Sequence, residues 1–133
     1  LVVYKEEIRE IVDTLQNSGI PVGLLIDPDP EQLKQAHRTN AQIVELHAGA
    51  YCDAKTSQTR HQEFLKMMDA VKLAQKLNLN IKAGRRLCYK TIKAFNGLGE
   101  IDEFSIGHSL ISRAVLKGME KAVKEMIDLI RTL

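Results

Sequence analysis

The sequence has few of the residues that mark specialised classes of protein. Its 133 residues include no tryptophan, two cysteines and three prolines. Cys52 and Cys88 lack metal-site spacing and are too few for a disulfide framework, which favours a reducing compartment. His37 and His61 stand alone on polar helical faces, so no metal site is predicted. The longest apolar runs, such as residues 22–26, fall far short of the roughly 18 residues of a membrane span. We expect a cytoplasmic protein without a signal peptide or a membrane partner.

The sequence also lacks an excess of charge of either sign. Lysine and arginine together number 19, against 17 aspartate and glutamate residues, and the formal net charge is +2 at pH 7. So small a charge argues against a nucleic-acid partner, and any phosphate binding must come from a local arrangement of groups. The chain is 44% hydrophobic. This composition and length predict a single domain over residues 1–133.

Segments typical of strands and of helices alternate along the chain. Short apolar or alternating runs predict strands at residues 22–26, 41–49, 80–84 and 102–107. Helical spacing of apolar residues predicts helices at 4–18, 30–39 and 59–77, in a short segment from 88, and from 109 onward with a break at Lys117-Gly118. Asp29 is the expected N-cap of the helix that begins at Pro30. Tyr51 and Cys52 are expected in a loop.

This order of elements predicts an α/β protein with a parallel sheet. Two architectures fit the pattern: an open doubly wound sheet, and a (β/α)8 barrel, or TIM barrel. A whole barrel needs about 250 residues, so this chain has room for about four β/α units. In both architectures the active groups gather where the strands end, so the residues at those positions are the candidates for chemistry.

Glu45 is the first such candidate. Period-two alternation places Glu45 and His47 on one face of their strand and Val44 and Leu46 on the other. If the apolar pair packs on the helices, the polar pair points toward the interior of a barrel. A carboxylate there is costly without a partner or a ligand, so Glu45 is a candidate for stabilising positive charge or relaying protons. The alternative is a structural glutamate bonded to a neighbouring lysine or to backbone amides.

The sequence Ile106-Gly107-His108-Ser109 marks the second candidate, at the junction of the last strand and the following helix. Free backbone N–H groups and the positive end of the helix dipole would face an anion there. Gly107 allows close approach of the backbone, and the imidazole of His108 could add a donor. The pattern predicts a phosphate site. The alternative is a simple turn at Gly107, with His108 or Ser109 capping the helix.

Four blocks of sequence together resemble the C-terminal half of the pyridoxine 5'-phosphate synthase family of vitamin B6 biosynthesis. The blocks are IPVGLLIDPDPEQL, AQIVELHAGAYCDAK, IKAGRRLCYKTIKAF and IDEFSIGHSLISRAVLKGMEKAVKEM. They follow the family's order and spacing over nearly the whole chain. The resemblance implies a (β/α)8 barrel that assembles into oligomers, in which this chain supplies the fifth to eighth strands and an extra C-terminal helix.

The resemblance also implies an activity and the roles of three residues. The family condenses 1-deoxy-D-xylulose 5-phosphate with 3-amino-2-oxopropyl phosphate to pyridoxine 5'-phosphate, phosphate and water, without a metal or an organic cofactor. Glu45 matches the family's inward glutamate, which is assigned to transition-state stabilisation. Gly107 and His108 match the backbone-plus-histidine site that holds a substrate phosphate.

Residues 82–87, KAGRRL, depart from the family pattern Asn-Ala-Gly-His-Gly-Leu. Arg85 occupies the position of the proton-donating histidine, and Arg86 that of a glycine whose backbone contacts the ligand. Arginine is a poor proton donor near neutral pH because its pKa exceeds about 12, but it can bind phosphate through two hydrogen bonds. The two arginines therefore either keep phosphate affinity at the expense of acid catalysis or are solvated loop residues.

Nothing in the chain corresponds to the N-terminal half of the family, which carries further phosphate-binding residues and the main general base. Four strands also leave two open sheet edges, which normally require partner strands. We expect either a first half elsewhere or a second copy that closes the barrel, and a homo-oligomer that binds phosphorylated small molecules. The alternative to an enzyme is a non-catalytic half-barrel that binds phosphate or supports assembly.

Overall fold

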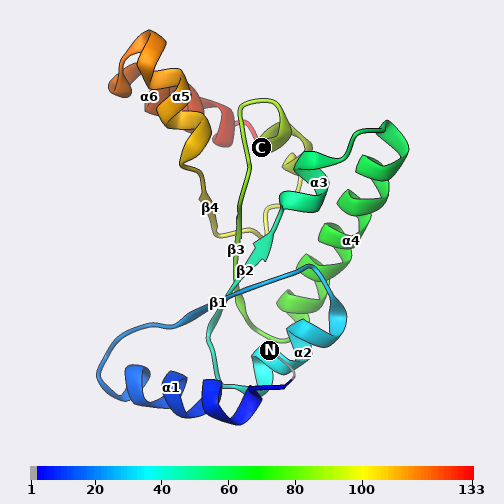
Figure 1. The fold of residues 1–133 in the computed structure, drawn as a ribbon, viewed down its shortest axis with the longest axis vertical. Helices are drawn as coiled ribbons and strands as arrows, with labels where there is room; N and C mark the ends of the chain where they lie inside the picture. Colours follow the sequence, from blue (N-terminus) through cyan, green and yellow to red (C-terminus); the bar gives the residue numbers. More distant parts are fainter. Residues whose placement is uncertain (1–2) are drawn as a thin grey trace.

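The computed structural model describes residues 3–133, which form one parallel sheet and the helices that connect its strands (Figure 1). The strands lie side by side in the order β1-β2-β3-β4, and all three pairings are parallel. The elements in chain order are α1 Lys5–Asn17, β1 Gly23–Ile26, α2 Pro30–Arg38, β2 Ile43–His47, α3 Gly49–Asp53, α4 Ser57–Lys76, β3 Asn80–Gly84, the 3-10 helix η1 Thr91–Phe95, β4 Glu103–Ser105, α5 His108–Lys117 and α6 Met119–Ile130.

The two faces of the sheet differ in burial, as alternation along the strands predicts. One face packs in the core, and its side chains are Leu24, Ile26, Val44, Leu46, Ile81 and Ala83. The other face is exposed or half-buried at Gly23, Leu25, Ile43, Glu45, Lys82 and Glu103. A doubly wound sheet would be covered by helices on both faces. Within residues 3–133 one face stays open. The α/β fold is therefore half of a (β/α)8 barrel, and not the doubly wound sheet that the sequence also allowed.

The core lies between the sheet and helices α2 and α4, with a group of aromatic rings toward β4. Phe95 of η1 is almost completely buried and makes edge-to-face contacts with Phe64 and Phe104 at 5.6 Å and with Tyr51 at 5.8 Å between ring centres. Aromatic pairs in this geometry are worth about 0.5–1.5 kcal/mol beyond their burial. These contacts join segments from α3, α4, η1 and β4, and so fix the ends of the strands relative to one another.

Most of the predicted elements are confirmed, and the differences have identifiable causes. The carboxylate of Asp29 accepts hydrogen bonds from the first turn of α2, as predicted for an N-cap. Tyr51 and Cys52, by contrast, were expected in a loop and lie instead in the short helix α3. The cause is tertiary: the Tyr51 ring is buried and its hydroxyl donates to the backbone oxygen of Thr91 at 3.1 Å. Helix α4 begins before its predicted start because Thr56 caps it.

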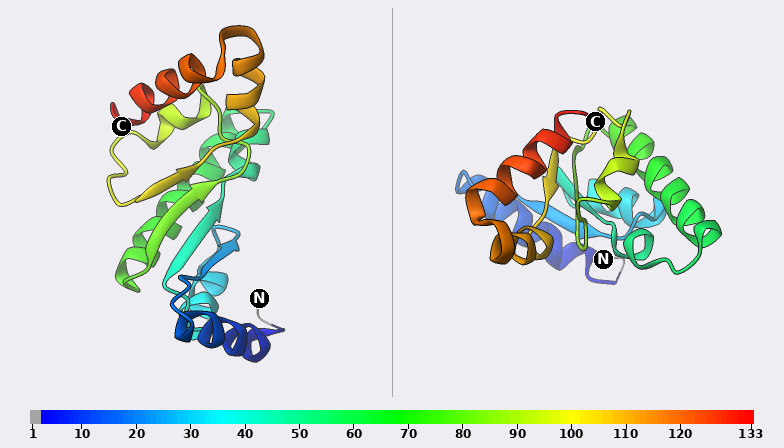
Figure 2. Two further views of the ribbon diagram at one scale, coloured as in Figure 1. Left: turned by 90° about the vertical axis from the view of Figure 1, so that its left-hand side faces the viewer. Right: turned by 90° about the horizontal axis from the view of Figure 1, so that it is seen from above.

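Helices α5 and α6 project from one end of the sheet, and α1 lies at the other end (Figure 2). The predicted break falls at Gly118, whose φ of +82° is a conformation that favours glycine. The guanidinium of Arg113 lies 4.3 Å from the centre of the Tyr89 ring and pairs with Glu125. Hydrogen bonds from Lys117 and Arg113 hold the pKa of Glu125 below its ordinary value. These contacts hold α5 against α6.

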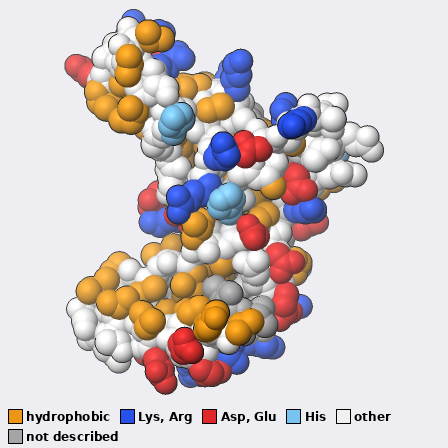
Figure 3. All heavy atoms as spheres, viewed as in Figure 1, with side chains coloured by type: hydrophobic (Ala, Val, Ile, Leu, Met, Phe, Trp, Pro, Cys, Tyr) orange, Lys and Arg blue, Asp and Glu red, His pale blue; other side chains and the backbone are white. Residues whose placement is uncertain are grey.

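Large apolar side chains remain exposed at both ends of the molecule (Figure 3). Helix α5 has no buried residue, and Val115 and Leu116 are 80% and 87% exposed. Tyr4 and Ile11 are exposed beside and within α1 at the opposite end. Across residues 3–133, no helix has the length and apolar character that crossing a bilayer requires.

Candidate functional site

One cleft at the carboxyl ends of β2, β3 and β4 brings together all five residues that the sequence singled out. Its volume is about 480 Å³, and its lining residues are Glu45, Arg85, Arg86, Leu87, Ser105, Ile106, Gly107 and His108. Parallel strands end on the same edge of a sheet, so residues far apart in the sequence meet there. The shared position is a finding about geometry, whereas the chemical role of each residue remains a prediction.

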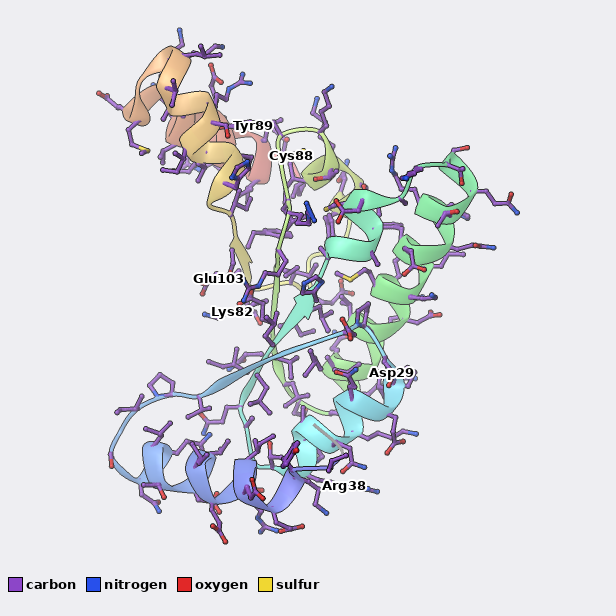
Figure 4. All side chains as sticks on the ribbon, in the orientation of Figure 1. Asp29, Arg38, Lys82, Cys88, Tyr89 and Glu103 are labelled. Carbon is purple, nitrogen blue, oxygen red and sulfur yellow. The ribbon has the colours of Figure 1, made fainter. Side chains whose placement is uncertain are left out.

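Glu45 lies on the open face of β2, and its surroundings favour a functional role over a structural one. Its neighbour in register on β3 is Lys82, but the Lys82 ammonium pairs with Glu103 on β4 at 2.7 Å instead (Figure 4). Within residues 3–133, no hydrogen bond or ion pair engages the Glu45 carboxylate. The lysine partner that a structural glutamate would need is therefore occupied elsewhere, and the carboxylate remains free for a ligand in the cleft.

Gly84 makes room for the Glu45 carboxylate above β3. A methyl group added at Gly84 would collide with Oε1 of Glu45 and would lie 2.9 Å from the Cβ of Ser105 on β4. The sequence suggested only that Gly84 ends a strand and begins a turn. Its close approach to two other strands depends on their register, and glycine at a strand end is the one signal of it that the sequence carries.

The N-terminus of α5 opens onto the same cleft. Gly107 is the N-cap residue. Among residues 3–133 no side chain caps the helix, and no atom lies within 4 Å of the place where a Gly107 side chain would begin. The alternative of a capping role for Ser109 is wrong, because the Ser109 hydroxyl donates to the backbone oxygen of Leu87 at 3.0 Å. The N–H groups of the first turn have no partner within the helix, so they can donate to an anion. His108 is exposed beside them.

Arg85 and Arg86 line the same cleft, in a strained backbone conformation. Their φ angles are +70° and +62°, values that cost an L-residue about 1–2 kcal/mol each. Both side chains are exposed, and Arg86 pairs with Asp53 at the end of α3, with 2.9 Å between Nη1 and Oδ2. At the strained position of Arg86, the family that the sequence resembles has glycine. Arg86 is thus tied to α3, whereas no hydrogen bond or ion pair engages the Arg85 side chain within residues 3–133.

The strain at Arg86 leads to a prediction about stability. We expect Arg86→Gly to have a free energy of unfolding about 1 kcal/mol higher than Arg86→Ala, because only glycine adopts a positive φ without cost. Both variants lose the exposed ion pair with Asp53, which contributes less than about 1 kcal/mol and cancels in the comparison. Urea unfolding followed by circular dichroism measures the difference. Equal values would show that the loop relaxes without strain.

No candidate metal centre emerges from the described part of the chain, where no three His, Cys, Asp or Glu side chains are grouped as metal ligands would be. His37 and His61 are both exposed, as their polar helical faces predict. The donors of the cleft are instead backbone N–H groups, guanidinium groups and an imidazole. This donor set suits a phosphate ester.

The fold is half of a parallel α/β barrel whose strand ends open onto one cleft. Comparison with known sequences identifies the family: the chain matches the family of the pyridoxal phosphate biosynthesis protein PdxJ over residues 1–132, and it belongs to that family. The resemblance seen in the four sequence blocks is therefore confirmed. This membership places the chain in vitamin B6 biosynthesis.

Several relatives of the chain carry the name pyridoxine 5'-phosphate synthase. The protein of Desulforapulum autotrophicum is 50% identical over 133 residues, which are 100% of this chain and 56% of the relative. The protein of Desulfosudis oleivorans is 48% identical, over 92% of this chain and 52% of the relative. The protein of Syntrophotalea carbinolica is also 48% identical, over 96% of this chain and 54% of the relative. The chain thus spans about half the length of the curated relatives it matches, as expected for half of a barrel.

Proposed function

We propose that the chain forms the C-terminal half of a pyridoxine 5'-phosphate synthase barrel. The proposed reaction condenses 1-deoxy-D-xylulose 5-phosphate with 3-amino-2-oxopropyl phosphate to pyridoxine 5'-phosphate, phosphate and water. The observation that supports it best is that a carboxylate, Glu45, and a helix N-terminus at Gly107, both without side-chain partners among residues 3–133, open onto one cleft. A phosphorylated substrate held at Gly107 would place its reacting carbon skeleton within reach of Glu45.

Each residue of the cleft has a proposed role in this reaction. The N–H groups that follow Gly107, together with the His108 imidazole, hold a substrate phosphate. The Glu45 carboxylate stabilises positive charge that develops on the reacting amine and carries protons between intermediates. Arg85 stands in the position of the family's proton donor and contributes its positive charge instead of a proton, and Arg86 adds a second cation beside it.

The remaining partners follow from the half-barrel. Sheet edges β1 and β4 are unpaired within residues 3–133, and the open face carries the charged side chains of Lys82 and Glu103. We propose that a first half, as in the relatives, or a second copy of the chain covers this face within a homo-oligomer. The proposed cellular location is the cytoplasm, where the phosphorylated substrates would be present, and the proposed chemistry uses no metal or organic cofactor.

Product formation tests the enzyme proposal directly. The chain is joined to the N-terminal half of the Desulforapulum autotrophicum relative, both phosphorylated substrates are added, and pyridoxine 5'-phosphate is followed by chromatography. We expect product with the joined protein and none with the chain alone, because the chain has no counterpart of the N-terminal residues. If the joined protein folds and makes no product, this chain does not support the reaction.

Arg85 and Arg86 favour a second candidate function, a half-barrel that binds phosphate esters without turnover. Their guanidinium groups can retain phosphate where the family's proton donor is absent. Calorimetric titration of the joined protein with each substrate distinguishes the two functions. Binding without product indicates the non-catalytic half-barrel, and binding with product indicates the enzyme.

A further inference from the structure

The two cysteines lie in segments that contact each other in the fold, although these segments are far apart in the sequence. Cys52 is in α3 and Cys88 is in the loop between β3 and η1, and both are free and partly exposed. The Thr91 hydroxyl donates to Sγ of Cys88 at 3.4 Å. Both residues that flank Cys52 contact this loop, Tyr51 through the backbone oxygen of Thr91 and Asp53 through Arg86.

The surrounding hydrogen bonds hold this arrangement in place. The backbone N–H of Cys88 donates to the Thr91 hydroxyl at 2.9 Å, which fixes the loop against the start of η1. The Tyr51 hydroxyl, one residue before Cys52, donates to the backbone oxygen of Thr91 at 3.1 Å. The threonine thus ties α3 to the loop that follows β3, and these are the two segments that carry the thiols.

The surroundings of the two thiols shift their pKa values in opposite directions. Burial acts to raise the pKa of Cys88, but hydrogen bonds from the Thr91 side chain and from the backbone N–H groups of Thr91 and Lys90 outweigh it and lower that pKa. Burial raises the pKa of Cys52. Because the thiolate is the nucleophile, we expect Cys88 to react first.

We propose that Cys88 and Cys52 form a peroxide-sensitive thiol pair, a modification site that closes to an intramolecular disulfide. The Cys88 thiolate attacks a hydroperoxide, the O–O bond breaks, and Cys88 becomes a sulfenic acid while the peroxide is reduced to an alcohol or water. The sulfur of Cys52 then attacks Sγ of Cys88, an S–S bond forms, and the hydroxyl leaves as water with the Cys52 proton. The inference does not depend on the proposed enzyme activity.

The disulfide would join α3 to the loop that carries Arg85 and Arg86. These two segments already contact each other through the Arg86–Asp53 ion pair. A covalent link beside that pair would limit movement of one wall of the candidate cleft. Oxidation is therefore expected to change the mobility of the arginine loop while the strands remain as they are.

Peptide mapping after peroxide treatment tests the proposal. The chain, alone and joined to its N-terminal half, is treated with equimolar hydrogen peroxide, blocked with iodoacetamide and digested with trypsin without reductant. We expect residues 39–55 linked to residues 87–90, with a mass lower by that of the two thiol hydrogens. We also expect iodoacetamide to label Cys88 of the reduced protein severalfold faster than Cys52.

Three variants and an unfolded sample make the result decisive. In Cys52→Ser, dimedone should trap the sulfenic acid of Cys88, and in Cys88→Ser the fast reaction should disappear. Thr91→Val, which keeps the shape of the side chain, should slow closure severalfold. In urea both thiols should react at one rate. A folded protein whose thiols also react at that rate, or one that gives only linkages between molecules, would overturn the proposal.

Discussion

Gly107→Asp is expected to weaken phosphate binding by about a hundredfold while leaving the fold intact. The new carboxylate would stand beside the first-turn N–H groups of α5, where it would repel the bound anion. Two unit charges about 4 Å apart interact by about 4 kcal/mol near a protein surface, and screening by salt reduces this value. The space around Gly107 is empty and its φ is −122°, so the substitution has no steric cost.

The control at this position separates charge from structure. Gly107→Asn adds a side chain of the same shape without the charge, and both residues are good N-caps. Both variants are therefore expected to unfold at the wild-type temperature or slightly above it. Both side chains can compete for a first-turn N–H group, but only aspartate repels the anion, so the aspartate variant should lose much more affinity than the asparagine variant in calorimetric titration with inorganic phosphate. Equal phosphate affinity in the two variants would show that the anion binds away from α5.

Gly84→Ala is expected to lower product formation about a hundredfold in the complete barrel and to lower the free energy of unfolding by about 1–3 kcal/mol. The new methyl group would occupy the place of the Glu45 carboxylate, which can move away because its side chain is flexible. The Cβ of Ser105 lies only 2.9 Å from the new atom and belongs to the neighbouring strand, so β4 must also shift. Both changes move groups that line the cleft.

Gly99→Ala is the matched control for this experiment. Gly99 is exposed in a turn with nothing within 4 Å of the added methyl group, and its backbone needs no positive φ. This variant should keep wild-type activity and stability in the same assays. If Gly84→Ala behaves like Gly99→Ala, Glu45 does not depend on the space above Gly84, and its proposed role in the cleft loses its geometric basis.

The strands and most helices could be predicted because their signals are local. Residues 22–26 and 80–84 are short apolar or alternating runs that end in turn-forming residues, and Asp29 followed by Pro30 is a local helix start. Helix α3 was missed because its cause is not local. Its five residues are too few for a helical pattern, and it forms where Tyr51 packs against Phe64 and Phe95.

The positions of the candidate site residues could be predicted from the sequence, but their pairings could not. Alternation placed Glu45 on the open face, and the strand-to-helix junction pointed to Gly107 and His108. Which groups pair with one another was not predictable, because pairing depends on register. The sequence left open whether a lysine neutralises Glu45, and the structure pairs Lys82 with Glu103 instead.

The sequence alone determined the alternation of strands and helices, the family, and the residues that gather at the strand ends, because each of these follows from local pattern or from sequence similarity. Only the tertiary structure decided that one face of the sheet stays open within residues 3–133, that Lys82 pairs with Glu103 and not with Glu45, and that the segments of Cys52 and Cys88 are joined at Thr91. These features arise when separate segments are brought into register, and the side-chain distances that result are not encoded in any single stretch of the chain.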